Sequence, residues 1–320
     1  MSHQRVFKIL MVTVFAVCIA MTSFSDAQEV LTLIDYNQDN KIGLQDVIHG
    51  LQIISGIQTP PTHKEKVVSF LEAVNARDVS TIEELVTEDY IQHNPFIPTG
   101  RDSFLALLPV LEQNGTKVQN IRVIEDGKFV AMHNLWTNAA PFGADTVVSF
   151  DILRFDDNGK IAEHWDAIQP WESETVSGRT MIDGPTNIID LEQTEANKAL
   201  AVSIIQDVLM GQNPDNITNH ISAEQYHQHN PSIGDGLEGI QAAVAYLISI
   251  NNMFQYTKIH KVIGEGNFVL TVSEGQWNNT TNAFYDLFRM ENGKAVEHWD
   301  VIQPVPTERL ANENGMFGGF

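Results

Sequence analysis

Two short stretches of the chain carry histidine and aspartate in the same order. The sequence Glu-His-Trp-Asp occurs twice, ending at Asp166 and at Asp300. In a strand, successive side chains point to opposite faces, so His164 shares a face with Asp166, and His298 shares one with Asp300. We expect that face to line a pocket. Burial in an apolar pocket raises the pKa of an aspartate because it disfavours the charged form, which suits a general acid or base.

A second pair of matching blocks adds two more histidines. The sequence Gln-His-Asn-Pro contains His93 in the first copy and His229 in the second. We expect these histidines to supply a third polar group at the pocket wall. Two other interpretations stay open: the aspartates are buried hydrogen-bonding residues that hold a strand end, and His-Asn-Pro is only a turn. Residues so far apart in the sequence are weak evidence for a metal site, and we predict no cofactor for the chemistry.

These blocks belong to an internal repeat. Three blocks recur at offsets of 136, 135 and 134 residues, which is the length of a whole domain and far above the period of solenoid repeats. The spacing predicts one domain at 62–170 and a second at 195–304. A linker at 171–194, rich in glycine, serine, threonine and acidic residues, separates them, and 305–320 forms a C-terminal tail.

Each copy has helical patterns first and strand patterns afterwards. The first helix of copy one buries a face of Val67, Phe70, Leu71 and Val74, and that of copy two one of Ala201, Ile204, Ile205 and Val208. Later helices are predicted at 102–112 and 237–250. The strands are predicted at 118–125, 128–136, 146–155 and 160–169, and at 256–263, 267–277, 283–290 and 294–303. This order predicts an α+β fold in which a curved antiparallel sheet wraps around helices and encloses an apolar pocket.

Residues 35–46 have the spacing of a calcium loop. Position 6 is asparagine where such loops usually have glycine, and an acidic turn without metal is the alternative. The apolar pattern that follows predicts a helix, so that 28–60 forms one loop-helix unit. The expected ligands are the side chains of Asp35, Asn37, Asp39 and Asp46 and the backbone carbonyl of Lys41.

The N-terminus has the pattern of an export signal. Arg5 and Lys8 precede an apolar run from Ile9 to Met21, and small residues before position 28 suit a cleavage site. We predict a signal peptide at 1–27 and a secreted or periplasmic protein. An uncleaved membrane anchor is the alternative, although the run is shorter than the roughly 20 residues that span a bilayer. Cleavage would remove the single cysteine, Cys18.

The charge of the chain excludes some classes of partner. The 19 lysines and arginines stand against 41 aspartates and glutamates, which gives a net charge of −22. Nucleic-acid binding needs clustered basic residues, and anionic membranes attract them, so neither partner is expected. A small ligand, and a protein partner at the calcium loop, remain.

The repeated blocks resemble the SnoaL-like proteins of the nuclear transport factor 2-like superfamily. The resemblance implies two cone-shaped α+β barrels, each with three helices over a curved sheet and a deep pocket. It also implies pairing through the sheets, here an intrachain pseudo-dimer. Polyketide cyclases of that family close rings by aldol condensation with an aspartate as acid and base, which indicates Asp166 and Asp300. Residues 35–57 resemble one dockerin type I repeat, a calcium-binding module.

Three functions are therefore weighed. The first is a cofactor-independent lyase or isomerase acting on a small carbonyl compound. The second is a protein that holds a small apolar ligand without turning it over. The third is a calcium-dependent interaction protein in which the two barrels are a scaffold.

Overall fold

The computed structural model describes residues 43–44, 47–48 and 61–320. Residues Pro61–Phe320 form one compact unit, separate from the chain before them. The predicted signal peptide lies outside the described residues, as do the predicted calcium ligands Asp35, Asn37, Asp39, Lys41 and Asp46. Within the described residues, no helix is both long and apolar enough to cross a bilayer.

The first half of this compact unit begins with the predicted amphipathic helix. α4 (His63–Ala76) starts at a capping box, in which the Thr62 hydroxyl accepts from the Glu65 backbone and the Glu65 carboxylate accepts from that of Thr62. Its four predicted core residues are all buried. The remaining elements are α5 (Val79–Leu85), β1 (Val86–Gln92), α6 (Arg101–Leu105), α7 (Leu108–Asn114), β2 (Lys117–Asp126), β3 (Phe129–Thr137), η1 (Ala140–Phe142), β4 (Thr146–Phe155) and β5 (Ile161–Pro170).

The second half repeats this order with altered helices. A single longer helix, α10, stands where the first half has α6 and α7, and a π-helical turn, η3, continues α8. The elements are η2 (Leu191–Gln193), α8 (Thr194–Ser203), η3 (Ile204–Leu209), η4 (Pro214–Asn216), α9 (Ile217–His220), β6 (His227–Gln228), α10 (Gly236–Ser249), β7 (Gln255–Glu265), β8 (Phe268–Trp277), β9 (Thr280–Glu291) and β10 (Lys294–Pro304).

Each half forms one five-stranded sheet, with the orders β1-β5-β4-β3-β2 and β6-β10-β9-β8-β7. The predicted α+β class is confirmed, and the eight predicted strands are present. The expectation of a purely antiparallel sheet is wrong, because β1 and β6 pair parallel to β5 and β10. Each of these edge strands ends at the glutamine of a Gln-His-Asn block. The pairing therefore brings each block alongside a Glu-His-Trp-Asp strand.

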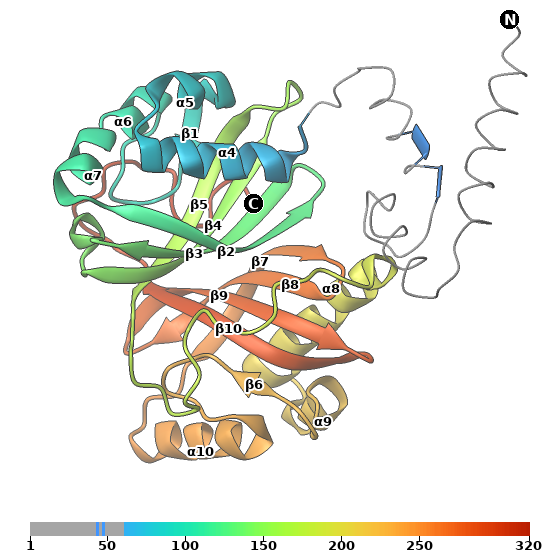
Figure 1. Cartoon of the computed structure of the whole chain (residues 1–320). Coiled ribbons are helices and arrows are strands. Elements are labelled where there is room, and N and C mark those ends of the chain that lie inside the picture. The colour runs from blue at the N-terminus through green and yellow to red at the C-terminus, as the bar shows by residue number, and fades with distance from the viewer. Residues whose placement is uncertain (1–42, 45–46, 49–60) are drawn as a thin grey trace, which may run out of the picture. The chain divides into compact units, whose positions relative to one another are not determined.

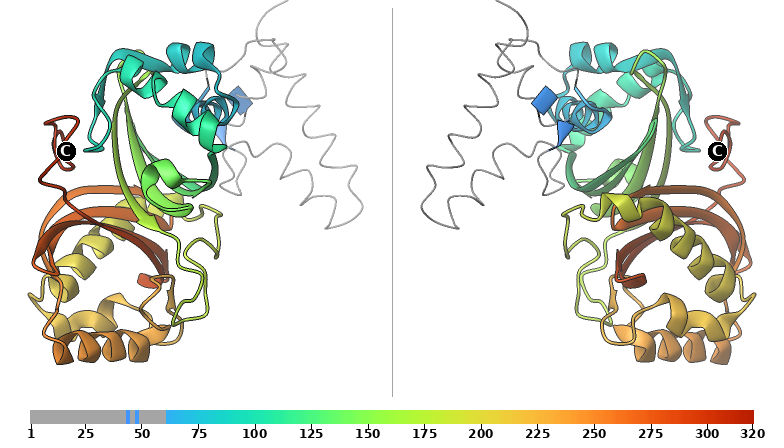
Figure 2. Two further views of the ribbon diagram at one scale, coloured as in Figure 1. Left: turned by 90° about the vertical axis from the view of Figure 1, so that its left-hand side faces the viewer. Right: turned by 90° about the vertical axis from the view of Figure 1, so that its right-hand side faces the viewer.

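The two sheets pack against each other, and the helices lie on the outer sides (Figures 1 and 2). The core between the sheets contains Trp165 and Trp299, both fully buried, as expected for the face opposite the aspartates. Two reciprocal hydrogen bonds join the halves: the Ile168 backbone donates to the Gln303 side chain at 2.7 Å, and Ile302 donates to Gln169 at 3.0 Å. The two halves therefore meet in a nearly twofold arrangement.

The segments that follow each sheet cross to the other half. Between the halves, the Asp183 carbonyl accepts from the Trp299 indole at 3.0 Å, and Met181 is buried in the inter-sheet core. At the C-terminus, the Gly318 carbonyl accepts from the Trp165 indole at 2.7 Å, and Phe320 stacks on that ring. The predicted linker and tail are thus packed parts of the fold.

Candidate active site

The inner face of the second sheet carries three titratable side chains close together. Asp286 comes from β9, and His298 and Asp300 come from the neighbouring strand β10. His298 donates from Nε2 to Asp286 Oδ1 at 3.1 Å. All three residues are buried and line one cavity beneath η3 and α10. The predicted pair His298 and Asp300 is therefore joined by an aspartate from the next strand.

Gln228 presents a hydrogen-bond acceptor to the second ring nitrogen of this histidine. The Gln228 Oε1 atom accepts from the backbone of Asn230 at 2.9 Å, which fixes the orientation of the amide. The same oxygen faces His298 Nδ1 at 2.9 Å. Both ring nitrogens of His298 thus face acceptors, which favours the doubly protonated ring. Burial opposes that charge, but the bond to Asp286 and the negative Asp300 outweigh it and raise the pKa of His298.

Asp300 is the carboxylate left available for chemistry. Its Oδ2 atom accepts from the Asn230 amide at 2.6 Å, and its Oδ1 atom is buried without a hydrogen-bond partner. Burial raises the pKa of Asp300 to about 6; His298 opposes this rise, Asp286 adds to it, and Asn230 opposes it. A carboxylate that lines an apolar cavity and has one oxygen without a partner can accept a proton from a bound molecule.

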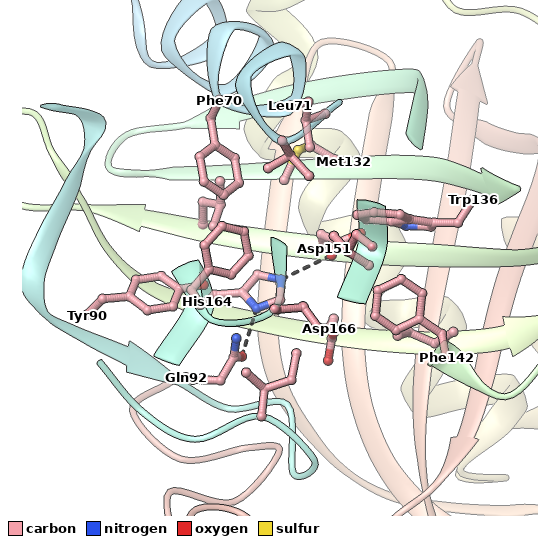
Figure 3. A pocket seen from close by; sticks show the side chains of 17 residues that line it. Phe70, Leu71, Tyr90, Gln92, Met132, Trp136, Phe142, Asp151, His164 and Asp166 are labelled. Atoms are coloured by element: carbon pink, nitrogen blue, oxygen red, sulfur yellow. Dashed lines mark hydrogen bonds and ion pairs between the residues drawn. The ribbon is translucent and has the colours of Figure 1, made fainter. Parts of the chain in front are cut away.

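The first half contains the same arrangement (Figure 3). His164 faces Asp151 Oδ1 at 3.0 Å through Nε2 and Gln92 Oε1 at 2.8 Å through Nδ1. Asn94 donates to Asp166 Oδ2 at 2.7 Å, and Asp166 Oδ1 has no partner. Burial raises the pKa of Asp166 to about 6, with His164 opposing and Asp151 adding to the rise. The bond to Asp151 and the charge of Asp166 raise the pKa of His164 in spite of its burial.

The two clusters differ in what supports the second aspartate. Asp151 accepts from Asn134 at 2.9 Å and, through a short hydrogen bond, from Ser149. Asp286 instead accepts from the Tyr256 hydroxyl, at 3.1 and 3.2 Å to its two oxygens. Both arrangements hold the carboxylate that orients the histidine, the first through an amide and a serine hydroxyl and the second through a tyrosine hydroxyl.

The cavities in front of the clusters differ more than the clusters do. The first has a volume of about 50 Å³, and the second about 630 Å³. A water molecule has about 30 Å³ in the liquid, whereas small-molecule pockets measure about 300–1,000 Å³. The second cavity therefore has the size of a small-molecule pocket, whereas the first is well below that range.

Comparison with known proteins assigns the first half to a family. The model of the SnoaL-like domain family matches residues 67–164. This part of the chain is a SnoaL-like domain. The match includes Asp151 and His164 and stops two residues before Asp166. No curated protein matches the chain.

Several solved structures resemble one part of the chain. IdmH from Streptomyces antibioticus, a candidate polyketide cyclase, is 20% identical over 34% of this chain and 93% of its own, with a TM-score of 0.30. SalBIII, an epoxide hydrolase/cyclase-like enzyme of salinomycin pyran-ring formation, is 23% identical over 33% and 90%, with a TM-score of 0.29. A steroid delta-isomerase from Pseudomonas aeruginosa is 18% identical over 35% and 85%, with a TM-score of 0.29.

The expectation that His93 and His229 lie at the pocket wall is wrong. In the SnoaL-like domain, His93 points to the opposite face, where it bonds Glu163 at 2.8 Å and stacks on Trp165. In the second half, His229 bonds Glu297 at 2.9 Å and stacks on Trp299. The backbone of this block is extended, so its side chains alternate, and the flanking glutamine and asparagine face inward instead.

Sequence reasoning missed six residues of the two clusters, although the repeat contained a signal for each. The Tyr-x-Gln-His-Asn-Pro block includes the inward glutamine and asparagine, and the matching Asp-x-Leu/Phe-Arg block includes the third acid. Applying the same period-two alternation to these blocks would have selected the inward residues. The missed residues are Gln92, Asn94, Asp151, Gln228, Asn230 and Asp286.

Each cluster also has donors of a kind that can bind a divalent cation. One histidine nitrogen and two carboxylate oxygens lie within 4.8 Å of one another in both halves. Carboxylate and imidazole are common ligands of such ions. In both halves, however, the histidine nitrogens already face a carboxylate and a glutamine oxygen, so a metal would have to displace one of these bonds.

Proposed function

We propose that the protein is a cofactor-independent acid–base enzyme that acts on a small carbonyl compound in the second cavity, as an isomerase or an aldol-type cyclase. Asp300 is the base. The observation that carries this proposal is the buried and unpartnered Oδ1 atom of Asp300, a residue that lines a largely apolar cavity of about 630 Å³. Burial keeps this carboxylate more basic than one in water, while His298 keeps part of it ionised.

The chemistry needs one mobile proton. The Asp300 carboxylate takes a proton from the carbon next to the carbonyl, whose C–H electron pair forms an enolate. In an isomerisation, Asp300 returns that proton to another carbon of the same molecule. In a cyclisation, the enolate carbon attacks a second carbonyl of the molecule, and the resulting alkoxide takes the proton back. His298 acts as a positioning residue, because both of its N–H groups are committed to protein acceptors.

Hydrogen exchange tests this proposal without knowledge of the natural substrate. 2-Tetralone is a neutral, apolar ketone with acidic C–H groups next to its carbonyl. In heavy water, the protein should accelerate loss of these proton signals in the NMR spectrum. No acceleration with 2-tetralone and with a panel of related neutral ketones, under conditions where they bind, would show that Asp300 does not act as a base.

The exchange rate should rise with pH and then reach a plateau. The base works only when ionised, and the pKa of Asp300 is about 6. We therefore expect kcat/KM for exchange to rise tenfold per unit below about pH 6 and to level off above it. A profile that is flat between pH 4 and 7 (about two units below to one above that pKa) would contradict the assignment of Asp300.

The second cavity also favours a binding protein without turnover. Its lining is dominated by aliphatic and aromatic side chains, which can hold an apolar ligand by burial alone. Native mass spectrometry of the purified protein separates the two functions. An unmodified ligand that copurifies and persists on incubation favours binding, whereas its conversion favours the enzyme.

We further propose that the second half is another SnoaL-like domain, so that the chain forms an intrachain pseudo-dimer. The equal strand orders and the reciprocal glutamine contacts support this assignment. The export signal at 1–27 and a secreted or periplasmic location are also proposals, supported by the sequence pattern alone.

The calcium loop gives a separate prediction. The chain from residue 28 onward should bind one calcium ion by isothermal titration calorimetry, because 35–46 supplies oxygen ligands at calcium-loop spacing. Asp39→Ala should abolish this heat, since it removes one of the charged ligands. Asn114→Ala, in α7 of the SnoaL-like domain, is the control and should bind as the parent does. Equal heats for the parent and Asp39→Ala would refute the loop assignment.

Loss of protein-partner capture on deleting 28–60 would support an interaction role.

A further inference from the structure

The two halves differ at one equivalent position, on β3 in the first sheet and on β8 in the second. Trp136 on β3 pairs with Val147, four residues before Asp151. Gly275 on β8 pairs with Asn282, four residues before Asp286. These two positions are therefore equivalent, but only Trp136 lines a cavity; Gly275 lies outside the lining of the second, where a Cβ atom would be 2.4 Å from the Gln255 carbonyl oxygen.

A loop completes the filling of the first cavity. In the SnoaL-like domain, η1 lies between β3 and β4 and places Phe142 against Trp136, with ring centres 5.2 Å apart. Both rings line the cavity and lie on its side opposite Tyr90 (Figure 3). In the second half, a two-residue turn at Asn278 and Asn279 replaces this loop, and both residues have positive φ. No side chain equivalent to Phe142 is available there.

The charges of the second cavity limit what can enter it. Among the described residues that line it there is no lysine or arginine, whereas Asp286 and Asp300 are both present. The only basic side chain of the lining, His298, donates both of its N–H groups to the protein. A carboxylate or phosphate would lose its water and find no cationic partner, which is costly in a buried site.

We propose that the second pocket alone takes a ligand, an uncharged and mainly apolar molecule with its reacting carbonyl toward Asp300, and that Trp136 and Phe142 keep the first pocket closed. This inference rests on the proposed function for the role of Asp300. It adds that one half of the repeat is catalytic and the other supports it. Trp136 and Phe142 are then the residues that make the two halves different.

A matched pair of fluorescent probes tests both parts. Methyl pyrene-1-carboxylate is neutral, and pyrene-1-carboxylate has the same rings with a negative charge at neutral pH. Fluorescence titration of the full chain should give one ester molecule per chain. The carboxylate should bind at least about tenfold more weakly, because it is buried without a partner. Two ester molecules per chain would overturn the proposal of a single open pocket. Equal affinity for the two probes would overturn the proposal that the ligand is uncharged.

Three variants locate the bound probe. Ala243→Trp places a large ring in the second cavity from α10 and should abolish binding, whereas Ala242→Trp on the same helix lies outside the lining and should not. The double variant Trp136→Ala/Phe142→Ala should open the first cavity and raise the ratio to two esters per chain. Circular dichroism checks that each variant is folded. If the double variant fails to fold, the ratio for the parent and the Ala243→Trp result still decide the inference.

The outcomes separate this inference from the proposed function. One ester per chain, lost in Ala243→Trp, supports the single pocket even if 2-tetralone exchange is absent, in which case only the enzymatic proposal fails. Exchange that persists in Ala243→Trp, together with unchanged ester binding, would place the ligand elsewhere and overturn the inference while leaving acid–base catalysis in place.

Discussion

Asp300→Asn is expected to abolish most of the exchange activity and at the same time to stabilise the protein. Removing a general base typically costs about 10²–10⁴ in rate. The amide keeps the shape of the side chain and can still accept from Asn230, but it cannot take a proton. The rate of deuterium incorporation into 2-tetralone and the free energy of unfolding in urea measure the two effects on the same samples.

The gain in stability follows from the direction of the pKa shift. The pKa of Asp300 is about 6 in the folded protein, against an ordinary value of 3.8. The folded state therefore holds the proton more tightly, and stability falls as pH rises from about 4 to about 6. At pH 7 the ionised carboxylate costs about 2–3 kcal/mol, by about 1.4 kcal/mol per pKa unit, and Asn removes that cost. Well below pH 4 the difference between variant and parent should vanish.

Asp166→Asn is the matched control within the same chain. Its carboxyl has the same asparagine donor, the same unpartnered oxygen and a pKa of about 6. Asp166→Asn should therefore be more stable than the parent at pH 7 by a similar amount. This difference should also vanish well below pH 4. If the first pocket is closed, exchange should stay at the level of the parent. Equal loss of exchange in both variants would instead assign chemistry to both halves, and no loss in Asp300→Asn would remove Asp300 from the mechanism.

The sequence was sufficient for the eight antiparallel strands and for the histidine and one aspartate of each cluster. Strand periodicity correctly placed His164, Asp166, His298 and Asp300 on the inner face, because alternation along one strand is a local property. The edge strands were not predicted, because β6 has two residues and gains its identity from pairing with β10. The roles of Gln92 and Gln228 depend on that pairing, and so did not follow from composition.

The difference between the pockets could not be read from the sequence for a related reason. Trp136 and Gly275 are 139 residues apart, whereas the repeat offsets were 134 to 136, because the loop after β3 is longer than the one after β8. Their equivalence appears only once the strand register is known. Two nearly identical clusters can thus face cavities of very different size, because cavity volume depends on long-range pairing.

A substitution at Gly184, in the predicted linker, is expected to lower the stability of the protein strongly. Gly184 has φ +93°, and a Cβ atom there would lie 2.5 Å from Glu297 Oε1 and 2.8 Å from the Trp299 ring. Glu297 is fully buried and bonds both His229 and Arg289. Gly184→Ala should therefore displace a buried charged side chain and a tryptophan of the inter-sheet core, in addition to straining the backbone.

Gly178→Ala separates these two costs. Gly178 lies in the same segment with φ +74°, but no atom would lie within 4 Å of its Cβ. It should lose about 1 kcal/mol from backbone strain alone. Gly184→Ala should lose about 2–4 kcal/mol, because overpacking adds about 1–3 kcal/mol to that strain. Urea unfolding of the full chain measures both values. Equal losses in the two variants would mean that 180–185 does not pack on the second sheet. A much larger loss at Gly184 would show that this segment helps to hold Glu297, and with it the strand that carries His298 and Asp300.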